Sequence, residues 1–215
     1  MNAPSPKAHF QYEDLRHQSD SALSGMWLFL ASECLFFGAL FLAWIYARHF
    51  RPAGFDYGAR LTALGLGTVN SVILLSSGVV YAAGVVFMER GEPRRLIACC
   101  RVAMLLGLLF LVLKFGFEWH DDFTHRYFPG AQFAIGGDLR DGAALFFTFY
   151  FVATALHGVH MLVGLGLVEW IVQRARRNEF SRAYSTPVTA VGLYWAFVDV
   201  VWIVLYPLIY LIGRG

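Results

Sequence analysis

The chain has 215 residues, of which 58% are hydrophobic and only 15% are charged. Typical soluble domains contain about 45–50% apolar and about 25% charged residues. The formal net charge is only +2, without the concentrated cationic stretch that binding to nucleic acid requires. The few charges gather in short stretches between long apolar segments. The composition therefore excludes a soluble enzyme and a nucleic-acid-binding protein, and it predicts an integral membrane protein.

The apolar segments are long enough to cross a bilayer as helices. A helix that spans the hydrocarbon core needs about 20 mostly apolar residues. Five segments meet this requirement, at about residues 24–47, 64–88, 96–117, 143–168 and 188–212. The alternating pattern of membrane strands is absent, so the backbone must satisfy its own hydrogen bonds within helices. The sequence predicts an all-α, polytopic membrane protein with one five-helix domain over residues 24–215.

Residues 1–23 are polar and predict a solvated N-terminal tail. The first span is too long for the apolar region of a cleaved signal peptide, and no basic region directly precedes it. Five crossings place the two termini on opposite sides of the membrane. More Lys and Arg residues fall on the N-terminal side, so we expect the N-terminus inside and the C-terminus outside.

Four ionisable residues lie deep within the predicted spans: Glu33, His157, His160 and Asp199. Counted from the inner end of each span at helical rise, they lie about 12 to about 16 Å deep. The sequence thus predicts that four titratable groups from three spans share one layer in the inner half of the membrane. Each needs a partner or a polar cavity, because an isolated charge at that depth costs several kcal/mol.

The histidines are open to several interpretations. His157 and His160 are three residues apart and share one helix face. Haem ligation would require a facing histidine on a second span, and no other span contains one. A proton relay or gate stays open, beside structural histidines of which one is hydrogen-bonded to Glu33. For Glu33 a neutral structural carboxyl and a proton-handling carboxylate are both open, whereas Asp199 is expected to be structural.

The remaining charges and thiols within the spans have simpler interpretations. Arg101 and Lys114 lie near span ends, so we expect their charges to reach the membrane surface. The cysteines, Cys34, Cys99 and Cys100, lack the spacing of a zinc, haem or copper motif. We expect them to be small packing residues and predict no metal or other cofactor in this chain.

Two other classes of membrane protein are weaker alternatives. Ser76 or Ser77 with His157 could suggest an intramembrane serine protease, but Ser and Gly at helix interfaces are common packing residues. A small transporter would more often show inverted repeats and helices broken by Gly or Pro at matching positions. Only Pro207 lies inside a span beyond its first turn, near the span's end.

Several polar residues embedded in apolar strings form a recognisable combination, which resembles subunit III of the haem–copper terminal oxidases. The resemblance covers about residues 24–212. The strings are GMWLFLASECLFF (25–37), NSVILLSSG (70–78), FEWHD (117–121), FFTFYFVATALHGVH (146–160) and YWAFVDVVWIVLYPLIYL (194–211). Each string alone is weak, but the set in this order is specific.

The resemblance implies a non-catalytic subunit of a proton-pumping cytochrome c oxidase in a bacterial inner membrane. Haem and copper would reside in the partner, subunit I, beside subunit II, and this chain would support proton uptake and hold phospholipids. By resemblance, Glu33 matches the family's buried glutamate, His157 and His160 its histidine pair, Asp199 its last-helix aspartate and Arg174 a lipid-headgroup arginine. A quinol oxidase, or an accessory protein of a nitric oxide reductase, is the alternative within the family.

Three departures from the family pattern accompany this resemblance. The sequence is similar to the five-helix form rather than the seven-helix form, so the lipid-filled cleft between the family's two helix bundles is not expected from this chain alone. Ala196 stands where the final motif usually has histidine, and Thr189 where many relatives have an acid. We expect Glu33 and a histidine to tie the first and fourth spans together, and thereby to fix a surface for the partner and for lipid.

Overall fold

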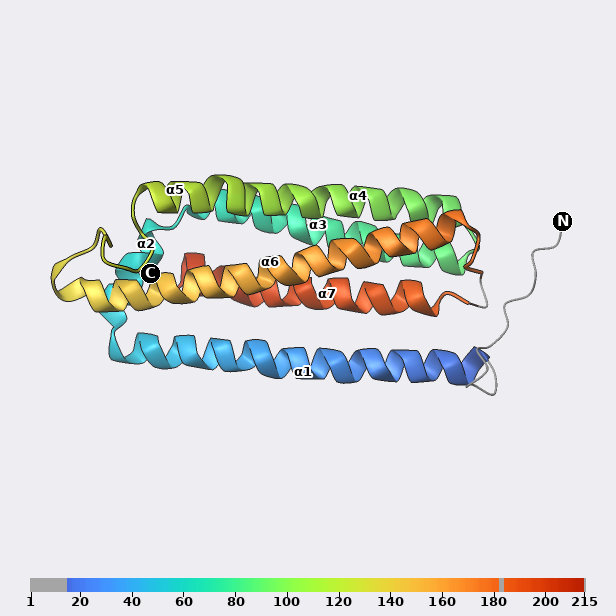
Figure 1. The fold of residues 1–215 in the computed structure, drawn as a ribbon, viewed down its shortest axis with the longest axis horizontal. Helices are drawn as coiled ribbons and strands as arrows, with labels where there is room; N and C mark the ends of the chain where they lie inside the picture. The colour runs from blue at the N-terminus through green and yellow to red at the C-terminus, as the bar shows by residue number, and fades with distance from the viewer. Residues whose placement is uncertain (1–14, 182–183, 215) are drawn as a thin grey trace.

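The computed structural model describes residues 15–181 and 184–214, and these residues form helices without any strand. Five long helices lie side by side along the long axis of the molecule (Figure 1). They are α1 (Leu15–Phe50), α3 (Leu64–Glu89), α4 (Pro93–Leu111), α6 (Arg140–Arg176) and α7 (Thr186–Tyr206). Shorter elements are α2 (Pro52–Leu61), the π-helical η1 (Val112–Glu118), α5 (Trp119–Thr124), the 3-10 turn η2 (Gly137–Leu139) and the π-helical η3 (Pro207–Leu211).

The prediction of an all-α bundle with five spans is confirmed. Five helical stretches are long and apolar enough to cross a membrane: Ser19–Phe50, Leu64–Glu89, Pro93–Thr124, Gly137–Arg176 and Thr186–Leu211. Each contains the segment predicted for it or ends within a residue of it. The clear differences are at the first span, whose helix begins at Leu15, and at two span ends. The third span continues past its predicted end at residue 117 to Thr124, and the fourth continues past residue 168 to Arg176.

Helix α1 stands at the edge of the bundle and contacts α6 and α7, while α3 and α4 form an antiparallel pair on the far side (Figure 1). One side of α1 is buried, through Leu30, Phe37 and Trp44 at intervals of seven residues. The opposite side carries large exposed apolar side chains, here called the α1 stripe: Leu28, Leu35, Leu42 and Tyr46. Because residues seven apart lie on the same side of a helix, the buried and exposed sets form two continuous faces.

The end of the bundle that holds the chain's C-terminus is closed by α2, a short helix that the sequence did not predict. Gly54 of α2 and Gly142 of α6 lie so close that a Cβ on Gly54 would be 2.6 Å from the Gly142 Cα. Only glycine permits this approach of two backbones. Arg214 donates to the carbonyl of Thr62 at 2.5 Å, which ties the end of the chain to α2. The start of α1 lies at the opposite end of the bundle (Figure 1).

Candidate functional site

Glu33 of α1 and His160 of α6 are joined by a hydrogen bond, with 3.1 Å between Glu33 Oε2 and His160 Nε2. His160 Nδ1 lies 2.8 Å from the carbonyl of Leu156, which can only accept, so Nδ1 carries a proton. The contact at Nε2 then contains a second proton, held either by the carboxyl or by the imidazole. The pair can therefore hold one proton between two helices, at a site where both side chains are mostly buried.

The surroundings of His160 fix the position of α1 against the bundle. The ring edge of Phe37 contacts the imidazole, with 5.2 Å between the ring centroids. The backbone carbonyl of His160 accepts a hydrogen bond of 3.0 Å from the hydroxyl of Tyr194 on α7. Three helices thus meet at this residue. The hydrogen bond between Glu33 and His160 is the tie between the first and fourth spans that the sequence analysis expected. The functional role of the tie stays a prediction.

His157 has a different environment from His160, although the two share one helix. It is completely buried between the rings of Phe110 and Trp202, at centroid distances of 5.5 and 5.0 Å. Neither of its ring nitrogens has a hydrogen-bond partner among the described residues. The two histidines therefore have different roles in the structure: His160 makes a polar contact with α1, and His157 packs against aromatic rings in the core.

Asp199 lies on a third interface, between α7 and α3. Its side chain abuts Gly78, and a Cβ on Gly78 would be 1.9 Å from Asp199 Oδ2. Asp199 is only 8% exposed, and its Oδ1 has no hydrogen-bond partner in the described part of the chain. A crevice of about 280 Å³ opens beside it and extends along both helices to Thr189. The four predicted site residues therefore do not converge on one centre.

Arg174 lies in the last turn of α6, where the chain leaves the helix. Its Nε donates to Glu179 Oε2 at 2.6 Å, and its guanidinium lies over the rings of Trp170 and Phe180. Its exposed fraction is 29%, so part of the cation remains available at this end of the bundle. The lipid contact expected for Arg174 is not tested by these contacts and stays a prediction.

The expectation for Lys114 was wrong. Its side chain is only 1% exposed, because the third span continues to Thr124 and places Lys114 inside the bundle. Its Nζ donates to Glu118 Oε1 at 2.9 Å, to Tyr210 at 2.7 Å and to Tyr150 at 3.1 Å. Arg101, in contrast, is exposed on the outside of α4, and the expectation that its charge reaches the membrane surface stays a prediction.

These groups form a buried charge cluster that the sequence analysis missed: Lys114, Glu118, Asp122, Tyr150 and Tyr210. The Tyr150 hydroxyl lies 2.7 Å from Asp122 Oδ2, and Tyr210 donates to Glu118 Oε1 at 2.5 Å. The cluster joins η1 and α5 to α6 and η3. Lys114, Glu118 and Asp122 follow at intervals of four residues, which places all three on one helix face. This spacing of charged residues in the sequence could have indicated the cluster.

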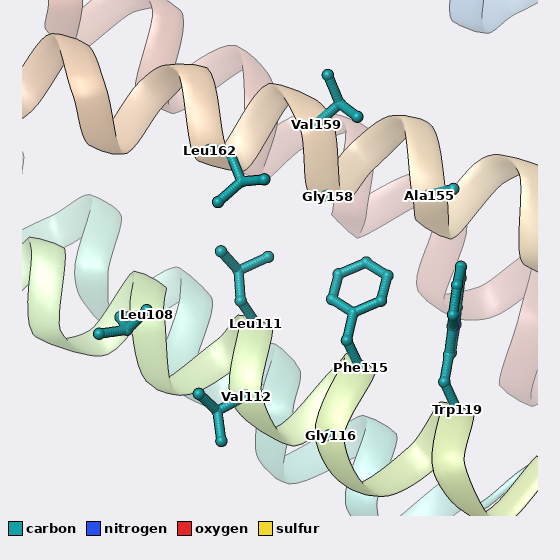
Figure 2. Close-up of a pocket in the computed structure, with 10 residues that line it drawn as sticks. All are labelled: Leu108, Leu111, Val112, Phe115, Gly116, Trp119, Ala155, Gly158, Val159 and Leu162. Carbon is teal, nitrogen blue, oxygen red and sulfur yellow. The ribbon is translucent and has the colours of Figure 1, made fainter.

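An apolar groove separates η1 from α6 on the outside of the bundle, here called the α4–α6 groove (Figure 2). Its volume is about 580 Å³. Figure 2 shows the ring of Phe115 directed toward Gly158, and Trp119 standing at one end of the groove. From Leu108 to Trp119 the groove runs about 16 Å at helical rise, close to half of the roughly 30 Å hydrocarbon core.

The contacts of the serines do not resemble those of a serine nucleophile. Ser77 accepts a hydrogen bond from the indole of Trp195 and donates to the carbonyl of Leu74, and Ser76 donates to the carbonyl of Val72. A nucleophile would need a base within hydrogen-bond reach. Across the described ranges 15–181 and 184–214, no three His, Cys, Asp or Glu side chains are grouped as metal ligands would be.

Comparison with known sequences connects this arrangement to a family. The sequence model of the family described as "Cytochrome c oxidase subunit III" matches residues 10–214, which is nearly the whole chain. The chain belongs to the cytochrome c oxidase subunit III family. The resemblance seen in the sequence strings is thereby confirmed, and with it membership in a family of haem–copper oxidase subunits.

Relatives within the subunit III family carry more than one oxidase name. The chain is 32% identical over 207 residues to "Cytochrome c oxidase subunit 3" of Synechocystis, covering 95% of this chain and 78% of the relative. It is 25% identical over 201 residues to "Probable quinol oxidase subunit 3" of Staphylococcus saprophyticus, covering 92% of each. It is also 30% identical over 200 residues to "Heme-copper oxidase subunit I+III" of Aeropyrum pernix, where 90% of this chain spans 23% of that much longer relative.

Proposed function

We propose that this chain is the non-catalytic subunit III of a proton-pumping cytochrome c oxidase in a bacterial inner membrane. It would pack against subunit I, which carries haem and copper, and operate beside subunit II. The observation that carries this proposal is the relative from Aeropyrum pernix, whose name joins subunits I and III in one chain. Fusion keeps two segments together in fixed stoichiometry, which supports a direct contact between this chain and subunit I.

The choice of cytochrome c as the electron donor rests on the pattern of relatives. Those named cytochrome c oxidase subunit 3 from Synechocystis and Thermostichus vulcanus are 32% and 30% identical to the chain. The Staphylococcus relatives named quinol oxidase are 25% or 26% identical. Purification of the chain with its partners from native membranes tests both the association with a haem-containing subunit I and the identity of the electron donor. We expect a haem-containing partner and oxidation of reduced cytochrome c, whereas oxidation of quinol alone would favour the quinol oxidase.

The contact with subunit I is assigned to the α1 stripe. Helix α1 buries the smallest share of any span against the rest of the chain, and the stripe presents large apolar side chains away from the bundle. The bond between Glu33 and His160 holds α1 in the orientation that displays the stripe. A helix fixed in this way can serve proton uptake into subunit I by keeping the neighbouring surface in place.

Substitution of Glu33 tests this role in the assembled oxidase. In Glu33→Ala the hydrogen bond is lost, so we expect a lower yield of this chain in the purified complex or a shorter active lifetime during turnover. In Glu33→Gln the side chain can still bond to His160 as a neutral donor, so both values should stay closer to those of the parent. Values for Glu33→Ala equal to the parent in both measurements would remove Glu33 from the proposal.

The phospholipid expected from the family is assigned to the α4–α6 groove. Its apolar lining suits a lipid acyl chain, and its length of about 16 Å matches the chain region of one leaflet. Val159 lines the groove, whereas Val163, one turn along α6, is exposed but does not line it. We expect Val159→Trp to lower the number of phospholipids retained in native mass spectrometry, and Val163→Trp to leave it unchanged. Equal retention in both variants would reject this site.

A further inference from the structure

The crevice between α3 and α7, here called the α3–α7 crevice, has Asp199 near the middle of its span and Thr189 in the first turns of α7. Ten residues separate the two, which at helical rise is about 15 Å, or half of the roughly 30 Å hydrocarbon core. The start of α7 and the start of α1 lie at the same end of the bundle, because Ser19 and Thr186 are hydrogen-bonded at 2.7 Å.

A buried carboxyl without a protein partner needs a polar companion. Asp199 Oδ1 is enclosed and has no hydrogen-bond partner among the described residues, and leaving such an acceptor unsatisfied costs about 1–3 kcal/mol. The same side chain lines the crevice. The neighbouring crevice of about 280 Å³ has room for several waters, each of which needs about 30 Å³. Asp199, the Thr189 hydroxyl and the Tyr81 hydroxyl provide polar contacts along an otherwise apolar lining.

The lining of the crevice ends at Gly78 and Asp199. Beyond them, toward the end that holds the C-terminus, two polar side chains at the contact of α3 and α7 are already paired. The indole of Trp202 donates to Ser71 Oγ at 2.9 Å, and Ser71 donates to the carbonyl of Gly67. These donors have no hydrogen left to continue a chain of waters. The α3–α7 crevice thus extends from Thr189, near the start of α7, to the carboxyl of Asp199, where it ends.

We propose that the α3–α7 crevice is a hydrated half-channel, which holds a short chain of waters and connects Asp199 to the membrane face at the start of α1. Through it the Asp199 carboxyl exchanges one proton with bulk water. The proton leaves the O–H bond, the electron pair stays on the carboxylate, and a neighbouring water accepts the proton and passes it on. Among the described residues that line the crevice, Tyr81 is the only other titratable group, and its hydroxyl donates to the carbonyl of Val188 at 3.1 Å.

Cysteine accessibility in native membranes tests the proposal without reference to the oxidase partner or the electron donor. In a chain whose Cys34, Cys99 and Cys100 are replaced by Ala, two lining positions receive a cysteine, Ala196→Cys on α7 and Ala82→Cys on α3. A small cationic, membrane-impermeant thiosulfonate reports on water, because the thiolate that reacts with it forms in water and not in hydrocarbon.

Each lining position has a control on its own helix that is exposed but lies outside the crevice: Val200→Cys on α7 and Val79→Cys on α3. We expect both lining cysteines to react at least tenfold faster than their controls, and only when the reagent is added at the face where α1 begins. A membrane-permeant maleimide should label all four, which shows that every variant is present and reactive.

Three results would overturn the half-channel. Lining cysteines that react no faster than the controls would mean that lipid or protein fills the crevice. If only one of the two lining cysteines reacted faster than the control on its own helix, the waters would not run between α3 and α7. Reaction from the opposite face alone would place the opening at the wrong end.

Discussion

The carboxylate of Asp199 occupies the space that a side chain at position 78 would fill: a Cβ on Gly78 would lie 1.9 Å from Asp199 Oδ2. Gly78→Ala must therefore displace Asp199 or separate α3 from α7. Overpacking of this kind costs about 1–3 kcal/mol of unfolding free energy. We expect a loss in that range, measured as a shift in the denaturant midpoint of the solubilised protein.

Removal of the carboxylate should relieve this clash. In the Asp199→Ala background we expect Gly78→Ala to cost less, with a coupling energy of at least about 0.5 kcal/mol between the two positions. Gly166→Ala is the matched control, because nothing lies within 4 Å of the Cβ that it would add. If the effects of Gly78→Ala and Asp199→Ala were additive, the position of the Asp199 side chain would not depend on the glycine at position 78.

Lys114 supplies the only cation of the buried charge cluster, whose carboxylates belong to Glu118 and Asp122. Lys114→Met leaves this buried negative charge without compensation, and breaking a buried pair by removing one partner costs about 3–5 kcal/mol. We expect a loss of this size in the free energy of unfolding. The exposed Arg101 on the same span is the control, and Arg101→Met should change the value by less than about 0.5 kcal/mol.

The double variant Lys114→Met, Glu118→Gln separates charge from packing. With the charges of Lys114 and Glu118 both removed, part of the stability should return, because replacing a whole buried pair is far less costly than removing half of it. Asp122 keeps its hydrogen bond from Tyr150 in this variant. Tyr210 can still donate to the side-chain oxygen of the glutamine. A double variant as unstable as Lys114→Met alone would show that Lys114 acts through its packing and not through its charge.

The misinterpretation of Lys114 shows what the sequence leaves open. The apolar pattern was enough to predict five spans, because each needs a long run of apolar residues. It placed the end of the third span before Glu118, since a glutamate followed by His120, Asp121 and Asp122 has the composition of a loop. The helix continues through these residues because Tyr150 and Tyr210, from distant parts of the chain, supply partners for the charges.

Side-chain pairing was predictable only in part. Glu33 and a histidine were expected to meet because both were deep, polar and on different spans, and the structure joins Glu33 to His160. Depth alone could not show that His157 would turn toward Phe110 and Trp202 instead. The short helix α2 was not predicted, because its ten residues lack a long apolar run and depend on contact with α6.

The imidazole of His157 contributes shape rather than polarity. Both of its nitrogens are buried without partners in the described structure, and each such group carries a desolvation penalty of about 1–3 kcal/mol. Phenylalanine has a similar shape and no polar atoms, so we expect His157→Phe to leave stability unchanged or to raise it by up to about 1 kcal/mol. Oxidase activity of the assembled complex should be unaffected. A large loss of activity with stability retained would instead support the proton relay.

Gly54 sets the distance between α2 and α6. A Cβ there would lie 2.6 Å from the Cα of Gly142 and 2.8 Å from the carbonyl oxygen of Leu139, and neither backbone atom can move aside as a flexible side chain would. We expect Gly54→Ala to lower the free energy of unfolding by about 1–3 kcal/mol and to raise proteolysis of the segment between α1 and α3. Gly38→Ala on α1 adds a Cβ into open space, so it should be neutral or gain up to about 1 kcal/mol from helix propensity. If the two alanine variants were equally stable, α2 would not be held by this contact, and the closed end of the bundle would depend on Arg214 and its carbonyl partners instead.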